Sequence, residues 1–212
     1  DLARSLAELP GVHADLLVKT NQRRTFTYCK PLTIFGARPP EEHSRLDTKN
    51  WTATPAAVTD ELLKQLDGVV GDVDAIILLD QVDIPETGVV TSLLLNRVAE
   101  IAAQRPAIWI LADSRSGLGR FSSVCWKMNR DELSRMTNSI DITDLARIQE
   151  LAREMAQRNG RHVFVTLSEQ GIVGASPFGE VEHVPAPAPS GPIDIVGAGD
   201  CVTAKLTTAL AA

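Results

Sequence analysis

Three short apolar segments alternate with segments of helical periodicity through the middle of this 212-residue chain. The apolar segments are Asp74–Leu79, Ala107–Ala112 and His162–Leu167. The helical segments lie between Thr54 and Gly68, between Val90 and Pro106, and between Asp141 or Thr143 and Gly160. A strand that is apolar along its whole length is typical of a parallel sheet covered on both faces. The β-α-β-α-β order therefore predicts an α/β fold in three layers, with helices around a mainly parallel sheet.

The residues before Thr54 have a different pattern. Leu16–Thr20, Thr25–Lys30 and Leu32–Phe35 are short strand-like segments without helical segments between them. They predict β-hairpins outside the main sheet.

Composition narrows the classes of function. A length of 212 residues and a hydrophobic content of 44% suit one domain with a substantial core. A net charge of −6 argues against a surface for nucleic acid. No segment has the length and apolarity of a transmembrane helix, and the first residues do not resemble a signal peptide. Three widely spaced cysteines favour a reducing compartment. We expect a cytoplasmic protein that binds neither nucleic acid nor membrane.

The segment Gly197-Ala198-Gly199-Asp200 precedes an apolar stretch of good helix formers, Cys201 to Ala212. Small residues let the backbone approach a ligand, and the amide groups at a helix N-terminus bind anions. A carboxylate at this place suits a general base better than a phosphate ligand. The alternative is a glycine-rich turn with Asp200 as an ordinary residue of the first helical turn.

Two motifs together resemble the PfkB or ribokinase-like family of carbohydrate kinases. Asp194 and Gly197–Asp200 match the family's Asp-Thr-Thr-Gly-Ala-Gly-Asp motif, and Asn129 and Glu132 match its Asn-x-x-Glu motif. The chain departs from the family where Ile195 and Val196 replace hydroxyl residues. The segment Thr166-Leu-Ser-Glu-Gln-Gly171 corresponds to the family's Thr-Leu-Gly-x-x-Gly motif, with Ser168 in place of glycine. Two further matches are looser, Arg45-Leu-Asp47 and Asp113-Ser-Arg115. Both lean toward the heptose-phosphate kinase and ribokinase branches.

The resemblance implies a ribokinase-like fold with a small β lid, which in this family often mediates dimers. It identifies residues 1–212 as a single PfkB-type domain that corresponds to the middle of such a kinase. The N-terminal segment with the sugar-binding Gly-Gly motif and the C-terminal helices of the family have no counterpart in it. The resemblance is compatible with a homodimer through the lid.

The resemblance also implies roles for individual residues. Asp200 would be the general base, and the amides of Gly197, Ala198 and Gly199 would form the anion hole. The remaining assignments are Asn129 and Glu132 for Mg²⁺, and Thr166, Ser168, Asp194 and Arg115 for ATP. Each has an ordinary structural alternative: a capping pair for Asn129 and Glu132, local backbone hydrogen bonds for the hydroxyls, and solvent exposure for Arg115.

Other polar residues near these motifs are harder to assign. Asp80 and Asp113 follow predicted strands, where α/β proteins bind ligands. Asp113 either orients Arg115 or caps the turn. Lys127 and Lys205 are interpreted as surface residues outside the site, with a phosphate-facing position as the alternative.

The predicted function is ATP-dependent phosphorylation of a hydroxyl group on a sugar or sugar phosphate. The competing hypothesis is a sugar or nucleotide sensor that retains the kinase fold without catalysis. The replaced residues before Gly197 and the serine at position 168 fit a sensor, whereas Asp200, Asn129 and Glu132 favour the enzyme.

Overall fold

A six-stranded sheet forms the centre of the molecule. The computed structural model describes residues 2–36, 38–140, 142–188, 191 and 196–212. The strands, in their spatial order, are β10 (Val181–Val184), β9 (Ile172–Ala175), β8 (Val163–Thr166), β7 (Cys125–Asn129), β6 (Trp109–Ser114) and β5 (Ala75–Asp80). Strands β5 to β8 are parallel, while β9 and β10 are antiparallel additions at one edge. The mainly parallel sheet is as predicted.

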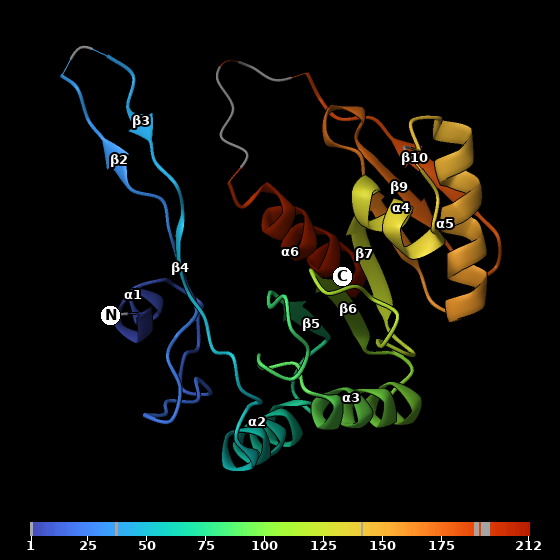
Figure 1. The fold of residues 1–212 in the computed structure, drawn as a ribbon. Helices are drawn as coiled ribbons and strands as arrows, with labels where there is room; N and C mark the ends of the chain where they lie inside the picture. The colour runs from blue at the N-terminus through green and yellow to red at the C-terminus, as the bar shows by residue number, and fades with distance from the viewer. Residues whose placement is uncertain (1, 37, 141, 189–190, 192–195) are drawn as a thin grey trace.

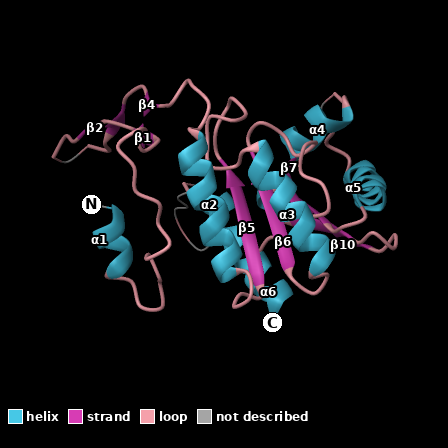
Figure 2. Cartoon of the chain, turned by 90° about the horizontal axis from the view of Figure 1, so that it is seen from below, coloured by secondary structure: helices cyan, strands magenta, loops and turns pink. Residues whose placement is uncertain are grey.

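Helices cover both faces of this sheet. They are α2 (Ala56–Val69), α3 (Ser92–Gln104), α4 (Arg130–Thr137), α5 (Leu145–Asn159) and α6 (Ala198–Ala211). Figure 2 shows α2 and α3 against one face of β5 and β6, with α6 on the opposite face. Helix α5 packs on β8 and β9 on the same side as α2 and α3. The arrangement has the three layers expected from the sequence.

The alternation of side chains along each strand explains the two cores. In β6, Ile110 and Ala112 join the larger core beneath α2, α3 and α5, while Leu111 joins a smaller core with Leu206 and Leu210 of α6. Successive residues of a strand point to opposite faces, so an uninterrupted apolar run fills both cores.

The helix starts differ in detail from the expected ones. Helix α2 begins after Pro55, and the hydroxyl of Thr54 donates to the carbonyl of Gly88 instead of capping the helix. Helix α5 begins after Asp144, whose carboxylate accepts from the Ala146 amide at 3.2 Å. Of the two predicted starts for this helix, Thr143 lies two residues early, and Asp141 lies outside the described residues.

The N-terminal residues form a separate arm, which we call the lid. It contains α1 (Leu2–Ala7), β1 (Thr27–Cys29), β2 (Leu32–Thr33), β3 (Glu41–Glu42) and β4 (Leu46–Thr48). Strand β1 pairs with β4 and β2 pairs with β3, so the lid is an antiparallel ribbon that extends away from the sheet (Figure 1). The predicted strand at Leu16–Thr20 is wrong, because these residues form a turn and irregular backbone.

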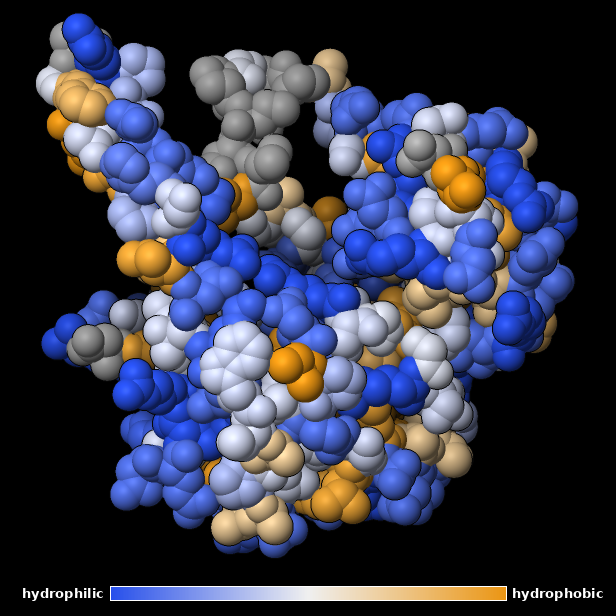
Figure 3. All heavy atoms as spheres, in the orientation of Figure 1, coloured by the Kyte–Doolittle hydropathy of each residue, from blue (hydrophilic) through white to orange (hydrophobic). Residues whose placement is uncertain are grey.

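The visible surface in Figure 3 is mostly hydrophilic, with scattered hydrophobic residues that include some on the lid. Among the helices of the described ranges, none combines the length and apolarity that a bilayer span requires.

Candidate active site

The first turn of α6 carries the predicted general base. Gly197 precedes the helix with φ at +75°, a left-handed conformation that favours glycine. No side chain of the described residues caps this end, so the first-turn amides keep their hydrogen-bonding capacity. Asp200 lies in the same turn, is exposed, and has no hydrogen bond or ion pair with any described residue. This end of α6 therefore offers free amides and a free carboxylate to a ligand.

A buried lysine lies directly beneath this turn. The side chain of Lys127, on β7, is only 5% exposed. Its ammonium nitrogen lies 3.3 Å from the position that a Cβ atom on Gly199 would occupy. The interpretation of Lys127 as a surface residue is therefore wrong. The absence of a side chain at position 199 lets the α6 backbone approach this ammonium group closely.

Asp113 joins the lysine to α6. Its Oδ2 atom accepts from the Lys127 ammonium at 2.8 Å and from the Thr203 hydroxyl at 3.3 Å. Asp113 is 7% exposed and Thr203 is 1% exposed. A buried charge needs a partner, and here the pair also fixes the helix against the ends of β6 and β7. Of the two sequence hypotheses for Asp113, neither matches this contact.

Asn129 and Glu132 form the start of α4. The Asn129 Oδ1 atom accepts from the Glu132 amide at 2.9 Å, and the Glu132 Oε2 atom accepts from the Asn129 amide at 2.8 Å. This reciprocal pair is a capping box. The structural alternative raised by the sequence is thus present. It leaves Glu132 Oε1 outside the capping bonds, with Arg135 at 4.0 Å.

The electrostatic surroundings of Glu132 link it to the buried pair. Burial raises the pKa of the Glu132 carboxyl above its usual value, although the hydrogen bond from the Asn129 amide opposes this rise. The carboxylate of Asp113 raises the same pKa and the ammonium of Lys127 lowers it. Glu132 therefore lies within electrostatic range of both.

The two predicted nucleotide hydroxyls differ in their surroundings. Thr166, at the end of β8, donates from its hydroxyl to the Met128 carbonyl at 3.3 Å and is engaged locally. Ser168 begins a short 3₁₀ turn with φ at +53°. This conformation explains physically why a glycine suits this position in the resembled motif. Asp194, the third predicted nucleotide residue, lies outside the described residues.

Arg115 follows β6 and is exposed. Its guanidinium carbon lies 5.2 Å from the ring centroid of Tyr28 in the lid. No carboxylate of the described residues lies within ion-pair distance of it. Its hydrogen-bond donors therefore remain available to a ligand.

Asp80 organises the loop that carries Arg115. The carboxylate is 1% exposed, and its Oδ2 atom accepts from the Ser114 hydroxyl at 2.8 Å and from the Ser116 hydroxyl at 2.9 Å. Arg120 donates to the same oxygen at 2.8 Å. The other oxygen, Oδ1, has no hydrogen-bond partner among the described residues. We call Asp80, Ser114, Ser116 and Arg120 the Asp80 clasp.

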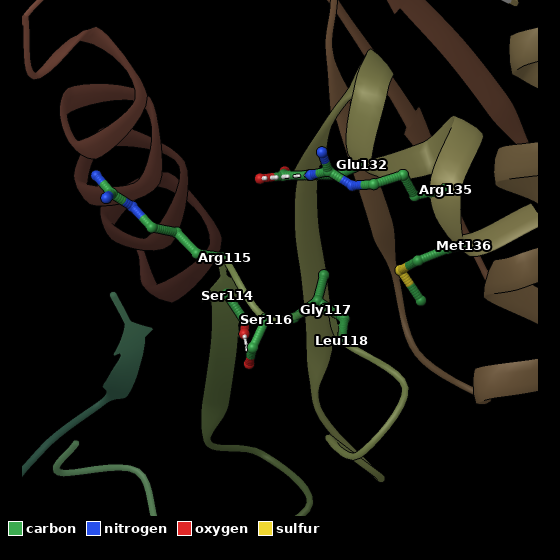
Figure 4. Close-up of a pocket in the computed structure, with 8 residues that line it drawn as sticks. All are labelled: Ser114, Arg115, Ser116, Gly117, Leu118, Glu132, Arg135 and Met136. Atoms are coloured by element: carbon green, nitrogen blue, oxygen red, sulfur yellow. Dashed lines mark hydrogen bonds and ion pairs between the residues drawn. The ribbon is translucent and has the colours of Figure 1, made fainter. Parts of the chain in front are cut away.

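A cavity of about 220 Å³ lies between this loop and α4. Its lining is Ser114, Arg115, Ser116, Gly117, Leu118, Glu132, Arg135 and Met136. Figure 4 shows Glu132 and Arg135 on one side and the two serines on the other, with the Arg115 side chain directed away from both. Two predicted site residues, Arg115 and Glu132, line this cavity, but the Arg115 guanidinium points to the opposite side of the loop.

The candidate residues meet at one edge of the sheet. Asp80, Asn129 and Thr166 are the last residues of β5, β7 and β8, and Asp113 is the next-to-last residue of β6. Parallel strands bring their carboxyl ends to the same side of the sheet. Within the described residues there is no group of three or more His, Cys, Asp or Glu side chains placed to hold a metal ion. The available oxygens, above all Glu132 Oε1, fit Mg²⁺ that keeps most of its water.

Sequence reasoning missed the burial of Lys127 beside α6 because the polar and aromatic residues of Cys125–Asn129 obscure a strand. A signal was present, since this lysine lies two residues before Asn129, and residues i and i+2 of a strand share a face. The bonds of Arg120 and Thr203 join distant segments and carry no local sequence signal.

Comparison with known proteins relates this chain to a protein family. Residues 112–212 match the pfkB family of carbohydrate kinases. The matched residues are just under half of the chain, and this C-terminal part is similar to the PfkB family. The bifunctional protein HldE of Gluconacetobacter diazotrophicus is 29% identical over 205 residues, which are 96% of this chain and 40% of the relative. HldE of Pelobacter propionicus is 28% identical over 95% of this chain, again 40% of the relative. The chain therefore spans about 40% of the length of these curated relatives.

Solved structures support the fold. A phosphofructokinase-2 variant of Escherichia coli matches with a TM-score of 0.59 and 24% identity, over 81% of this chain and 54% of the other. The ribokinase of Giardia lamblia matches with a TM-score of 0.61 and 16% identity, over 84% and 54% of the respective chains. These PfkB-like structures confirm the predicted ribokinase-like α/β fold.

Proposed function

We propose that this chain is part of an ATP-dependent kinase that phosphorylates a hydroxyl group of a sugar or sugar phosphate. The observation that carries the proposal is the first turn of α6. There the exposed carboxylate of Asp200 has no hydrogen bond or ion pair with a described residue, and no described side chain caps the adjoining amides. Phosphoryl transfer needs a base at the acceptor hydroxyl and positive groups around the transferring phosphoryl group. The similarity of residues 112–212 to pfkB family carbohydrate kinases supports the same reaction class.

Each residue then has a defined task. Asp200 takes the proton from the acceptor hydroxyl as the hydroxyl oxygen attacks the terminal phosphorus of ATP. The bond between that phosphorus and the bridging oxygen breaks, and ADP leaves with the bridging oxygen. The amides of Gly197, Ala198 and Gly199 donate to the transferring phosphoryl group, where negative charge collects. Lys127, held by Asp113 beneath Gly199, adds a positive potential at the same place.

Asn129 and Glu132 would hold Mg²⁺ through its water shell, chiefly with Glu132 Oε1. The ion would neutralise charge on the ATP phosphates. Because Asn129 Oδ1 and Glu132 Oε2 also cap α4, the helix start fixes where these side chains lie. Thr166, Ser168 and Asp194 stay assigned to the nucleotide side of the site in this proposal, and Arg115 is assigned to a phosphate of ATP or of a phosphorylated substrate.

A second candidate is a sensor that binds sugar or nucleotide without catalysis. The observation that favours it is the capping box, because helix formation alone accounts for Asn129 and Glu132. The replacement of hydroxyl residues by Ile195 and Val196 points in the same direction.

The deciding experiment is Mg²⁺-dependent ADP release by the full-length protein, with a panel of sugars and sugar phosphates as acceptors. We expect a stimulated rate that falls by about 10²-fold or more in the Asp200→Asn variant, the usual range for loss of a general base. Asp60→Asn, at an exposed carboxylate on α2, is the matched control and should keep the rate. An unchanged rate in Asp200→Asn would contradict the proposed base. Ligand binding without stimulation by any acceptor would support the sensor.

The proposal also covers the cellular compartment and the oligomeric state. We expect the protein to act in the cytoplasm, where ATP and sugar substrates are present. We also propose a homodimer through the lid, where Leu32 and Ile34 leave 54% and 78% of their surface exposed.

A further inference from the structure

Two arginines from distant parts of the chain stack on one tyrosine. The guanidinium carbons of Arg45 and Arg115 lie 5.0 and 5.2 Å from the ring centroid of Tyr28. Arg45 precedes β4 of the lid, whereas Arg115 belongs to the loop after β6 at the candidate active site. A guanidinium stacked on an aromatic ring keeps its edge donors for other partners.

Residues at the end of β5 hold both Arg115 and Tyr28 in this stack. The Asp80 carboxylate binds the hydroxyls of Ser114 and Ser116, and the Asp80 carbonyl accepts from the Arg115 amide at 3.0 Å. With its two neighbours held inward, Arg115 projects outward. The next residue, Gln81, accepts the hydroxyl of Tyr28 at 2.9 Å. Asp80, the last residue of β5, and Gln81, which follows it, therefore position the arginine and the tyrosine together.

The charges around the stack leave Arg115 as its available cation. Arg45 pairs with Asp47 at 2.7 Å, and Lys49 pairs with Asp83 and Asp47. Arg115 has no ion pair with a described carboxylate, although Asp83 is close enough to interact with it electrostatically. Three cations thus face two carboxylates in a protein whose net charge is −6. Such a local excess of positive charge attracts anions.

We propose that Arg115, held by the Asp80 clasp and stacked with Arg45 on Tyr28, forms a subsite for a phosphate group. Guanidinium groups bind phosphate oxygens with charge-assisted, often bidentate hydrogen bonds. The phosphate belongs either to ATP or to a phosphorylated sugar, so the source rests on the proposed kinase function. Asp80 is a positioning residue in this arrangement, because it acts through Arg115.

Tyr28 supplies a direct probe, since it is the single tyrosine of the chain. Protein labelled with 3-fluorotyrosine gives one ¹⁹F resonance from the centre of the proposed subsite. We expect inorganic phosphate to shift this resonance saturably, beyond the effect of chloride at equal ionic strength. The Arg115→Ala variant should weaken the dissociation constant for phosphate by about tenfold or more. Arg147→Ala, which removes an exposed arginine on α5, should leave it unchanged.

Comparison of probes identifies the source of the phosphate. If it belongs to the acceptor, fructose 6-phosphate shifts the resonance, fructose does not, and saturating ATP leaves the response intact. If it belongs to the nucleotide, ATP shifts the resonance and competes with inorganic phosphate. The subsite is overturned if phosphate causes no saturable shift, or if Arg115→Ala binds phosphate as well as the parent protein.

The positioning role of Asp80 has its own readout. In Asp80→Asn we expect the resonance of the anion-free protein to move and phosphate affinity to fall. Ser116→Ala removes one anchor and keeps the buried pair of Asp80 and Arg120, so it serves if Asp80→Asn does not fold. An unchanged resonance and affinity in the folded variants would overturn this role. None of these measurements requires turnover, so a failure of the kinase assay and a failure of the subsite are distinguishable.

Discussion

The ammonium group of Lys127 lies against Gly199, 3.3 Å from where a side chain at that position would begin. The lysine belongs to the central sheet and the glycine to the first turn of α6, so this contact joins the rigid core to the proposed anion hole. Asp113 completes the junction by binding Lys127 and Thr203. The position of Asp200 relative to the sheet therefore depends on a buried charge pair.

Loss of Lys127 should reduce stability as well as activity. Lys127→Met leaves the buried Asp113 carboxylate without its partner at 2.8 Å, which typically costs about 3–5 kcal/mol in the free energy of unfolding. Urea unfolding measures this loss. The double variant Lys127→Met with Asp113→Asn removes both charges and should recover most of the stability. Its kinase rate should stay low, because the positive potential beneath Gly199 is still missing. Recovery of both properties would contradict the catalytic part of this role.

Ser168 should lower the stability of the protein because of its backbone conformation. Its φ of +53° is costly for a residue with a side chain, so Ser168→Gly is expected to raise the free energy of unfolding by about 1 kcal/mol. Ser134→Gly is the matched control in the interior of α4, where the same change should lower it by about 1 kcal/mol. A loss of stability in Ser168→Gly would show that the serine makes a compensating contact.

The sequence predicted the strands and helices whose burial gives a regular apolar pattern along the element. Strands β5, β6 and β8 are apolar on both faces, so their composition identifies them, as does the periodicity of α3 and α5. Strand β7 escaped prediction because Lys127 interrupts its apolar pattern, and that lysine is buried only because Asp113 arrives from the neighbouring strand. A partner supplied by another element leaves no trace in the local pattern. The Asp80 clasp and the Tyr28 stack depend on similar long-range contacts.

The three cysteines should differ sharply in reactivity. Burial raises the pKa of the Cys125 thiol to about 11, whereas Cys29 and Cys201 are exposed. The thiolate is the reactive form, so near pH 8 we expect a disulfide reagent to modify two thiols of the native protein and the third only after unfolding. Cys125→Ala is the control and should leave the native count at two. Three thiols reacting at similar rates in the native protein would contradict the buried position of Cys125.

The proposed dimer can be tested through the exposed apolar residues of the lid. Ile34→Asp places a charge at the proposed interface and should convert the dimer to a monomer in sedimentation velocity experiments. Ile140→Asp makes the same change at a side chain that is 93% exposed in the loop after α4, and it should keep the parent assembly. A parent protein that is monomeric at high concentration would exclude the dimer.

The capping box affects which of the two motifs would persist in related chains that lose catalysis. Asn129 and Glu132 start α4 whatever the protein does, so a descendant without catalysis would still lose stability by replacing them. Asp200 has no comparable side-chain contact with the described part of the chain, so its substitution would cost such a descendant little stability. Selection for folding thus preserves one motif and leaves the other free to drift. On the proposed mechanism, the residue at position 200 distinguishes catalytic from non-catalytic relatives better than the Asn-x-x-Glu motif does.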